Sequence, residues 1–119
     1  MIITLPFPPS TNTVWRNLRG RTLLSRKGRE YRKAVMALVA NQNAAAGLSG
    51  RLSVTVELYP PDRRKRDIDN YGGKALLDAI THAGVWLDDE QIDRLELIRG
   101  EIRKPGEAVV TITECEGMV

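Results

Sequence analysis

The chain has 119 residues, of which 42% are hydrophobic and 28% charged, and this composition is that of one ordinary globular domain covering residues 1–119. No apolar stretch approaches the roughly 20 residues that a membrane span requires, and prolines break the apolar N-terminus, so we expect neither a membrane protein nor a signal peptide. The single cysteine, Cys115, excludes an internal disulfide and is compatible with a cytoplasmic location.

The net charge of +3 is distributed unevenly along the chain. Residues 1–66 contain 13 Lys or Arg and 3 acids, whereas residues 67–119 contain 5 Lys or Arg and 12 acids. A basic half indicates contact with the phosphates of a nucleic acid, and an acidic half supplies carboxylates that bind a cation.

The first third of the chain predicts a strand, a loop and a helix. Residues 3–7 alternate apolar and polar or small side chains, which predicts a short strand ended by prolines. Residues 10–24 are rich in Asn, Arg and Gly and are interpreted as a loop. Ser25 is a suitable N-cap for a helix that runs to about Ala46, where Gly47 ends it.

The rest of the chain predicts three strands and one more helix. Residues 52–58 alternate strictly, and a helix is expected from Asp69 or Asn70 to about Ala83. A strand bulged near Gly100 is expected at 92–103, followed by a turn and a last strand at 108–113 paired with it. The order βαβαββ predicts an α+β fold of two layers, with two helices on a roughly four-stranded mixed sheet.

The predicted loop carries a tryptophan among cations. Trp15 lies beside Arg16, with Arg19 and Arg21 close behind. An indole in this setting can stack on a base or fill the opening of a DNA junction, and a role as an anchor of the core or loop is an equal alternative.

Four cations run directly into two carboxylates at residues 63–69, read RRKRDID. The cations attract phosphate, and the carboxylates attract a hydrated metal ion, so the pair of features suits a metal-dependent nuclease. The cations are Arg63, Arg64, Lys65 and Arg66, and the acids are Asp67 and Asp69. A solvated charged turn is the alternative. An EF-hand-like loop beginning at Asp67 is a weaker alternative, because Tyr71 and Asp78 occupy two of its ligand positions.

A second acidic pair, Asp88 and Asp89, follows the predicted second helix. That helix is roughly 20 Å long at 1.5 Å per residue, so the two acidic groups meet only if the chain folds back after Gly84. Whether one metal site includes both groups therefore depends on tertiary packing.

Several motifs along the chain resemble the RusA Holliday junction resolvases. They are TLPFPPSTN at residues 4–12, RGRT at 19–22, RRKRDIDN at 63–70, KALLDAITHAGVWLDD at 74–89 and TITE at 111–114. The resemblance implies a homodimer, of bacterial or prophage origin, that binds four-way DNA junctions. It also implies paired, symmetric nicks that depend on Mg²⁺, with Mn²⁺ as a substitute.

The resemblance also implies roles for individual residues. Asp67, Asp69 and Asp89 correspond to the catalytic, metal-binding aspartates of the family, and Lys74 corresponds to its catalytic lysine. The arginines and lysine at 16, 19, 21 and 63–66 would then hold the arms of the junction through phosphates. In the family the lysine usually lies three residues after the Asn, whereas DNYGGK places Lys74 one residue later.

Three functions remain open from the sequence. The first is a junction-resolving endonuclease, the second a less selective flap or fork endonuclease, and the third a junction-binding protein that does not cut. Residues 85–87, Val-Trp-Leu, are candidates for a dimer interface, although a core role for Trp86 is at least as well supported. His82 is expected to be structural, near the last carbonyls of its helix.

Overall fold

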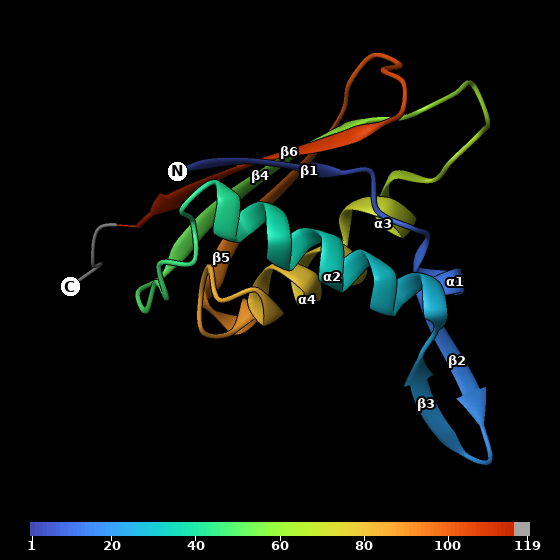
Figure 1. Cartoon of the computed structure of the whole chain (residues 1–119). Helices are drawn as coiled ribbons and strands as arrows, with labels where there is room; N and C mark the ends of the chain where they lie inside the picture. The colour runs from blue at the N-terminus through green and yellow to red at the C-terminus, as the bar shows by residue number, and fades with distance from the viewer. Residues whose placement is uncertain (116–119) are drawn as a thin grey trace.

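The computed structural model describes residues 1–115 as a four-stranded sheet with helices on one face and a two-stranded hairpin that projects away from it (Figure 1). The elements follow in the order β1 (Ile2–Pro6), α1 (Thr11–Val14), β2 (Trp15–Leu18), β3 (Arg21–Leu24), α2 (Arg26–Asn41), β4 (Leu52–Tyr59), α3 (Ile68–Gly72), α4 (Lys74–His82), the 3-10 turn η1 (Asp89–Gln91), β5 (Ile92–Arg99) and β6 (Glu107–Glu114). The α+β class and the four-stranded sheet are confirmed. No helix within residues 1–115 is long and apolar enough to cross a membrane.

The sheet is mixed, as predicted, but its strand order is β1-β6-β4-β5. β4 pairs in parallel with β5 and antiparallel with β6, and β6 also pairs with β1. The prediction that the last strand pairs with the strand before it was wrong. β6 buries Ala108, Val110 and Ile112 and takes a central place, whereas β5 is largely exposed and forms an edge.

The core lies between the sheet and the two longer helices. Strand residues such as Val54 and Val110 pack with Val35 of α2 and Leu76 and Ile80 of α4. All five side chains are fully buried, because the apolar stripe of each helix faces the apolar side of the sheet.

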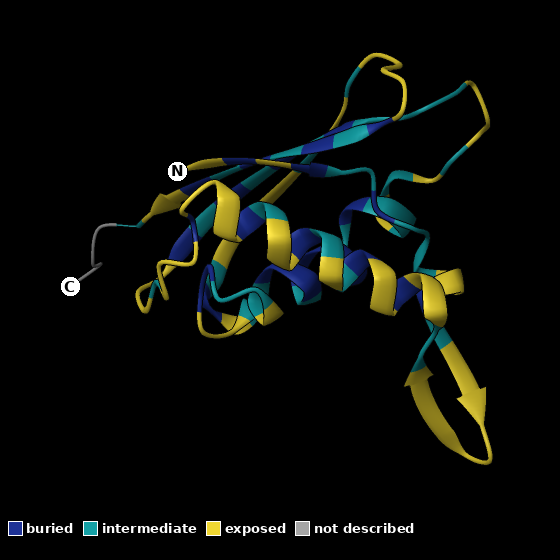
Figure 2. Cartoon of the chain, in the orientation of Figure 1, coloured by how far each residue is buried: buried dark blue, intermediate teal, exposed yellow. Residues whose placement is uncertain are grey.

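The predicted loop at 10–24 is instead the short helix α1 and the β2–β3 hairpin. The pair Leu18↔Arg21 closes the hairpin over the two residues Arg19 and Gly20, whose φ angles of 51° and 77° are both positive. Two-residue hairpin turns with this geometry match the twist of the strands, and glycine accepts it without steric cost. Residues 16–23 are all exposed (Figure 2).

The two predicted helices differ from the structure at their ends. Ser25 caps α2 as predicted, accepting a hydrogen bond from the Gly28 amide, but α2 ends at Asn41, before Ala46. The second predicted helix is divided at Gly73 into α3 and α4. A Cβ atom on Gly72 would lie 2.9 Å from a methyl carbon of Leu97, so this glycine lets α3 pack closely against β5.

Candidate nuclease site

The first acidic pair lies at the start of α3. Asp67 is the N-cap residue in extended conformation, Asp69 is in the first turn, and both are exposed. The Thr11 hydroxyl donates a hydrogen bond to the Asn70 carbonyl, which connects this segment to the base of the hairpin. The two carboxylates therefore lie at a surface where the chain segments 11–14 and 67–70 meet.

The other acidic side chains of the site, Asp78 and Asp89, lie near Lys74. Lys74 is the first residue of α4, and its Nζ atom lies 3.7 Å from Oδ2 of Asp78, one turn further along the helix. Asp89 is half-buried at the start of η1, which packs against α4. Burial, the neighbouring Asp88 carboxyl and the charge of Asp78 raise the pKa of Asp89, and Lys74 opposes this rise.

Asp88 has the opposite shift. The backbone amide of Glu90 donates to its carboxylate at 3.1 Å, and this bond, together with the Asp89 side chain, lowers the pKa of Asp88. The Asp88 carboxylate thus caps η1, while Asp89 lies toward Lys74 and Asp78.

Asp78 was not predicted as a neighbour of Lys74. The sequence pattern places Asp78 only at a position of a calcium loop, and that loop is wrong because residues 68–72 and 74–82 are helical. The signal that could have found it is its spacing of four residues from Lys74, which places both side chains on one face of a helix.

The two acidic groups do not form a metal site within one chain. Among residues 1–115, no three Asp, Glu, His or Cys side chains are close enough together to hold a metal ion. A carboxylate site for Mg²⁺ needs several converging oxygens, so Asp67, Asp69 and Asp89 do not fit one as a single chain arranges them. Asp67 and Asp69 lie at the start of α3, whereas Asp89 lies at the start of η1.

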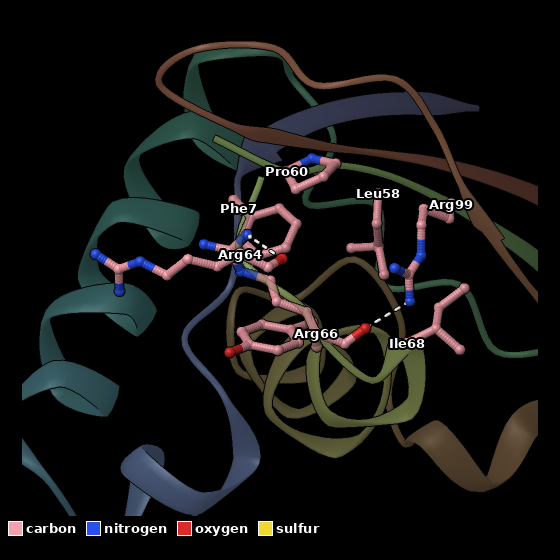
Figure 3. Close-up of a pocket in the computed structure, with 8 residues that line it drawn as sticks. Phe7, Leu58, Pro60, Arg64, Arg66, Ile68 and Arg99 are labelled. Carbon is pink, nitrogen blue, oxygen red and sulfur yellow. Dashed lines mark hydrogen bonds between the residues drawn. The ribbon is translucent and has the colours of Figure 1, made fainter. Parts of the chain in front are cut away.

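The four cations of the basic run beside Asp67 differ in their exposure to solvent. Arg63, Arg64 and Lys65 are exposed, but the side chain of Arg66 is only 13% exposed and pairs with Asp62 at 2.9 Å. Figure 3 shows Arg66 among the residues that line a small cavity beside this loop. Its guanidinium lies 5.4 Å from the ring centre of Phe7 and 5.7 Å from that of Tyr71. Arg66 therefore holds the loop in place.

The hairpin carries the other predicted cations and brings Arg16 near Lys74. Arg16, Arg19 and Arg21 are exposed, and Trp15 is half-buried at the hairpin base. Trp15 and Arg16 line one open groove together with Lys74. This groove joins two sets of residues that are about 58 positions apart in the sequence.

The residues suggested for a dimer interface lie mostly in the core. Val85 and Trp86 are buried, and the indole N–H of Trp86 donates to the Thr81 hydroxyl, so the core alternative for Trp86 is confirmed. Leu87 is exposed. His82 is exposed in the last turn of α4.

A small α+β domain that presents cations from a hairpin and a loop beside a lysine and several carboxylates has the features of a phosphodiester-cleaving, DNA-binding protein. The model of the endodeoxyribonuclease RusA family matches residues 6–113. The chain therefore belongs to the RusA family of endodeoxyribonucleases, as its motifs predicted.

Several curated relatives are similar to this chain over most of both lengths. The crossover junction endodeoxyribonucleases RusA of Shigella sonnei strain Ss046 and Escherichia coli strain K12 are each 43% identical to it over 112 residues. The protein of that name from Enterobacteria phage 82 is 42% identical. In each case the match covers 94% of this chain and 92% of the relative.

Proposed function

We propose that this protein is a Holliday junction resolvase, an endonuclease that nicks four-way DNA junctions during recombination and repair in the bacterial cytoplasm. The observation that carries the proposal is the 43% identity to crossover junction endodeoxyribonucleases over nearly the whole of both chains. The cations beside the carboxylates support it, because the same surface can hold phosphate and cut next to it.

The DNA contacts of the proposal come from two segments. Arg16, Arg19 and Arg21 of the hairpin, with exposed residues 63–65 of the loop, would hold the junction arms through their phosphates. Lys74 lines a groove together with Arg16 of the hairpin, and its ammonium group would neutralise the negative charge that develops on the phosphate during cleavage.

The proposed cofactor is a divalent metal ion, Mg²⁺ with Mn²⁺ as a substitute, and its proposed ligands are Asp67, Asp69 and Asp89. Oxygen ligands of this kind are the ones that these ions prefer. Because one chain does not bring the three together, we propose that the site is completed in a homodimer.

The topology suggests how two copies could complete it. The unpaired edge of the sheet at β5 offers room for a partner strand, whereas the side chain of Gln42 bonds both the amide and the carbonyl of Thr4 in the opposite edge strand. Asp89 begins η1, the turn that directly precedes β5, and Arg99 at the other end of β5 donates to the Arg66 carbonyl, next to Asp67. Antiparallel pairing of β5 with its copy would place the partner subunit's Asp89 on the side of Asp67 and Asp69.

A comparison of DNA substrates tests the function. Four-way junctions, flaps and linear duplexes, each end-labelled, are incubated with the protein in Mg²⁺ or in EDTA and run on a denaturing gel. We expect paired, symmetric nicks in the four-way junction only, and only with Mg²⁺. Equal cutting of flaps would favour the less selective endonuclease, and a shifted band on a native gel without nicks would favour a junction-binding protein.

A further inference from the structure

An open groove of about 410 Å³ lies between the β2–β3 hairpin and the start of α4. Its walls are formed by Thr11, Trp15, Arg16, Asn17 and Thr22, and Lys74 lies at its α4 side. The groove thus combines an indole ring, cations, an amide and hydroxyl groups. Its volume falls in the range of about 300–1,000 Å³ in which small ligands bind.

The indole of Trp15 is held at the base of the hairpin. Trp15 also lines a much smaller hollow together with Leu24, Gly28 and Ala75, so this residue lies between the groove and the packed side of the hairpin base. Two hydrogen bonds fix this base to α2: the Ser25 amide donates to the Val14 carbonyl, and the Arg29 guanidinium donates to the Leu24 carbonyl at 2.8 Å. Trp15 therefore lines the groove from a supported position.

Asn17 is oriented by its neighbour on the facing strand. The Thr22 hydroxyl donates to Oδ1 of Asn17 at 3.1 Å, so the hydrogen-bonding capacity that remains on this side chain is mainly its two N–H donors. Trp15 and Asn17 are two residues apart in a strand, and they pair with Leu24 and Thr22, so both project from the same face of the hairpin.

We propose that the groove binds one unstacked nucleotide of the DNA, next to the phosphate that Lys74 contacts. Its base stacks on Trp15, its edge accepts hydrogen bonds from the Asn17 amide, and its phosphate lies beside Lys74. Unstacked bases are accessible at the branch point of a junction and absent from a regular duplex. The inference rests on the proposed function, and it makes Trp15 and Asn17 the residues that determine where the protein cuts.

The fluorescence of Trp15 tests the stacking directly. The only other tryptophan is the buried Trp86, so the variant Trp86→Phe has a single indole reporter. An immobile four-way junction is added in EDTA until the protein is saturated, and the anisotropy of labelled DNA measures binding. We expect the emission of Trp15 to be quenched as the junction binds. Unchanged emission at full binding would overturn the proposal, whether or not the protein cuts.

The choice of cut site tests the role of Asn17. Wild type and Asn17→Ala are incubated in Mg²⁺ with a mobile junction that can present many sequences at its branch point. We expect the wild type to cut at preferred positions and the variant to cut more evenly. The ratio of cutting at favoured positions to cutting at disfavoured positions should fall about tenfold in the variant. The control is Leu18→Ala, an exposed residue on the other face of the hairpin, which should retain the wild-type pattern.

The two tests separate failure of this inference from failure of the proposed function. If wild type nicks the junction but Asn17→Ala cuts in the wild-type pattern and Trp15 is not quenched, the groove does not bind a base, although the protein is a resolvase. If wild type does not nick, the resolvase proposal fails, and the fluorescence result alone decides whether the groove binds a nucleotide.

Discussion

Arg63 and Arg66 belong to one run of four cations, yet their environments differ. Arg63 is exposed, whereas the side chain of Arg66 is largely buried against two neighbouring aromatic rings and pairs with Asp62. A run of identical charges in a sequence gives no indication of which member turns inward. Here the selecting feature is Phe7, brought next to the loop by the end of β1, together with Tyr71 of α3.

The difference between these two arginines can be measured. We expect Arg66→Ala to lower the free energy of unfolding by about 1–2 kcal/mol, because it removes a charge-assisted hydrogen bond and the packing of the side-chain stem. Urea unfolding checks this. Arg63→Ala is the control: it should unfold as wild type does and bind junctions more weakly. Equal stability of the two variants would contradict the structural role of Arg66.

The Asp62–Arg66 pair also predicts a dependence of stability on pH. The hydrogen bond from Arg66 lowers the pKa of Asp62 below its ordinary value of 3.8. The folded state then favours the ionised carboxylate, so this stabilisation is complete above pH 3.8 and is lost as the pH falls through the lower folded-state pKa. We expect Asp62→Asn to be less stable than wild type at pH 7, and the difference to shrink in acid. A constant difference would contradict the assignment.

Asp69 is the residue that most directly separates cutting from binding. We expect Asp69→Asn to lower the nicking rate by about 100-fold or more, because it removes one proposed metal ligand, while junction binding stays within about threefold of wild type. Band shifts in EDTA measure binding, and denaturing gels in Mg²⁺ measure nicking. A variant that nicks at the wild-type rate would remove Asp69 from the proposed site.

At the scale of single elements, the sequence predicts long helices and strands with a regular apolar pattern, but it does not predict short elements without one. The alternation in β4 and the Ser25 cap of α2 predicted their elements, because each depends on local spacing. The β2–β3 hairpin was missed, since its four-residue strands carry polar side chains on both faces and bury little. The break at Gly73 was also missed, because glycine near a helix start is compatible with a continuous helix.

We expect the three arginines of the β2–β3 hairpin to contribute to junction binding. Replacing Arg16, Arg19 and Arg21 together by Ala should weaken junction binding and lower the slope of log K against log salt by about 2.7, if each arginine contacts one phosphate. The melting temperature should not change, because all three side chains are exposed. Lys104→Ala, which removes an exposed cation from the turn before β6, should leave the slope unchanged. An unchanged slope in the triple variant would show that the hairpin does not hold DNA.

At the scale of the whole molecule, the arrangement of the proposed site residues could not be predicted from the sequence. The motifs predict Asp67, Asp69, Lys74 and Asp89 as site residues, but they carry no information about which of these a single chain brings together. The structure brings Lys74 close to Asp78 and Asp89, whereas Asp67 and Asp69 lie at the start of the preceding helix, α3. The pairing of β5 in parallel with β4 was equally hidden, because it depends on contacts between distant segments.

We propose that two copies of the chain complete one nuclease site, and mixed dimers test this most directly. Asp69→Asn and Asp89→Asn are each expected to be inactive. When the two variants are co-expressed, each mixed dimer has one site with both substitutions and one site with neither, so nicking of one strand of the junction should return.

The matched control is co-expression of Asp67→Asn with Asp69→Asn, which leaves every mixed site with a substitution. We expect nicking by the Asp69→Asn and Asp89→Asn mixture and none by the control. If both mixtures are as inactive as the separate variants while the dimers form, the acids act within one chain and the two-copy site is wrong.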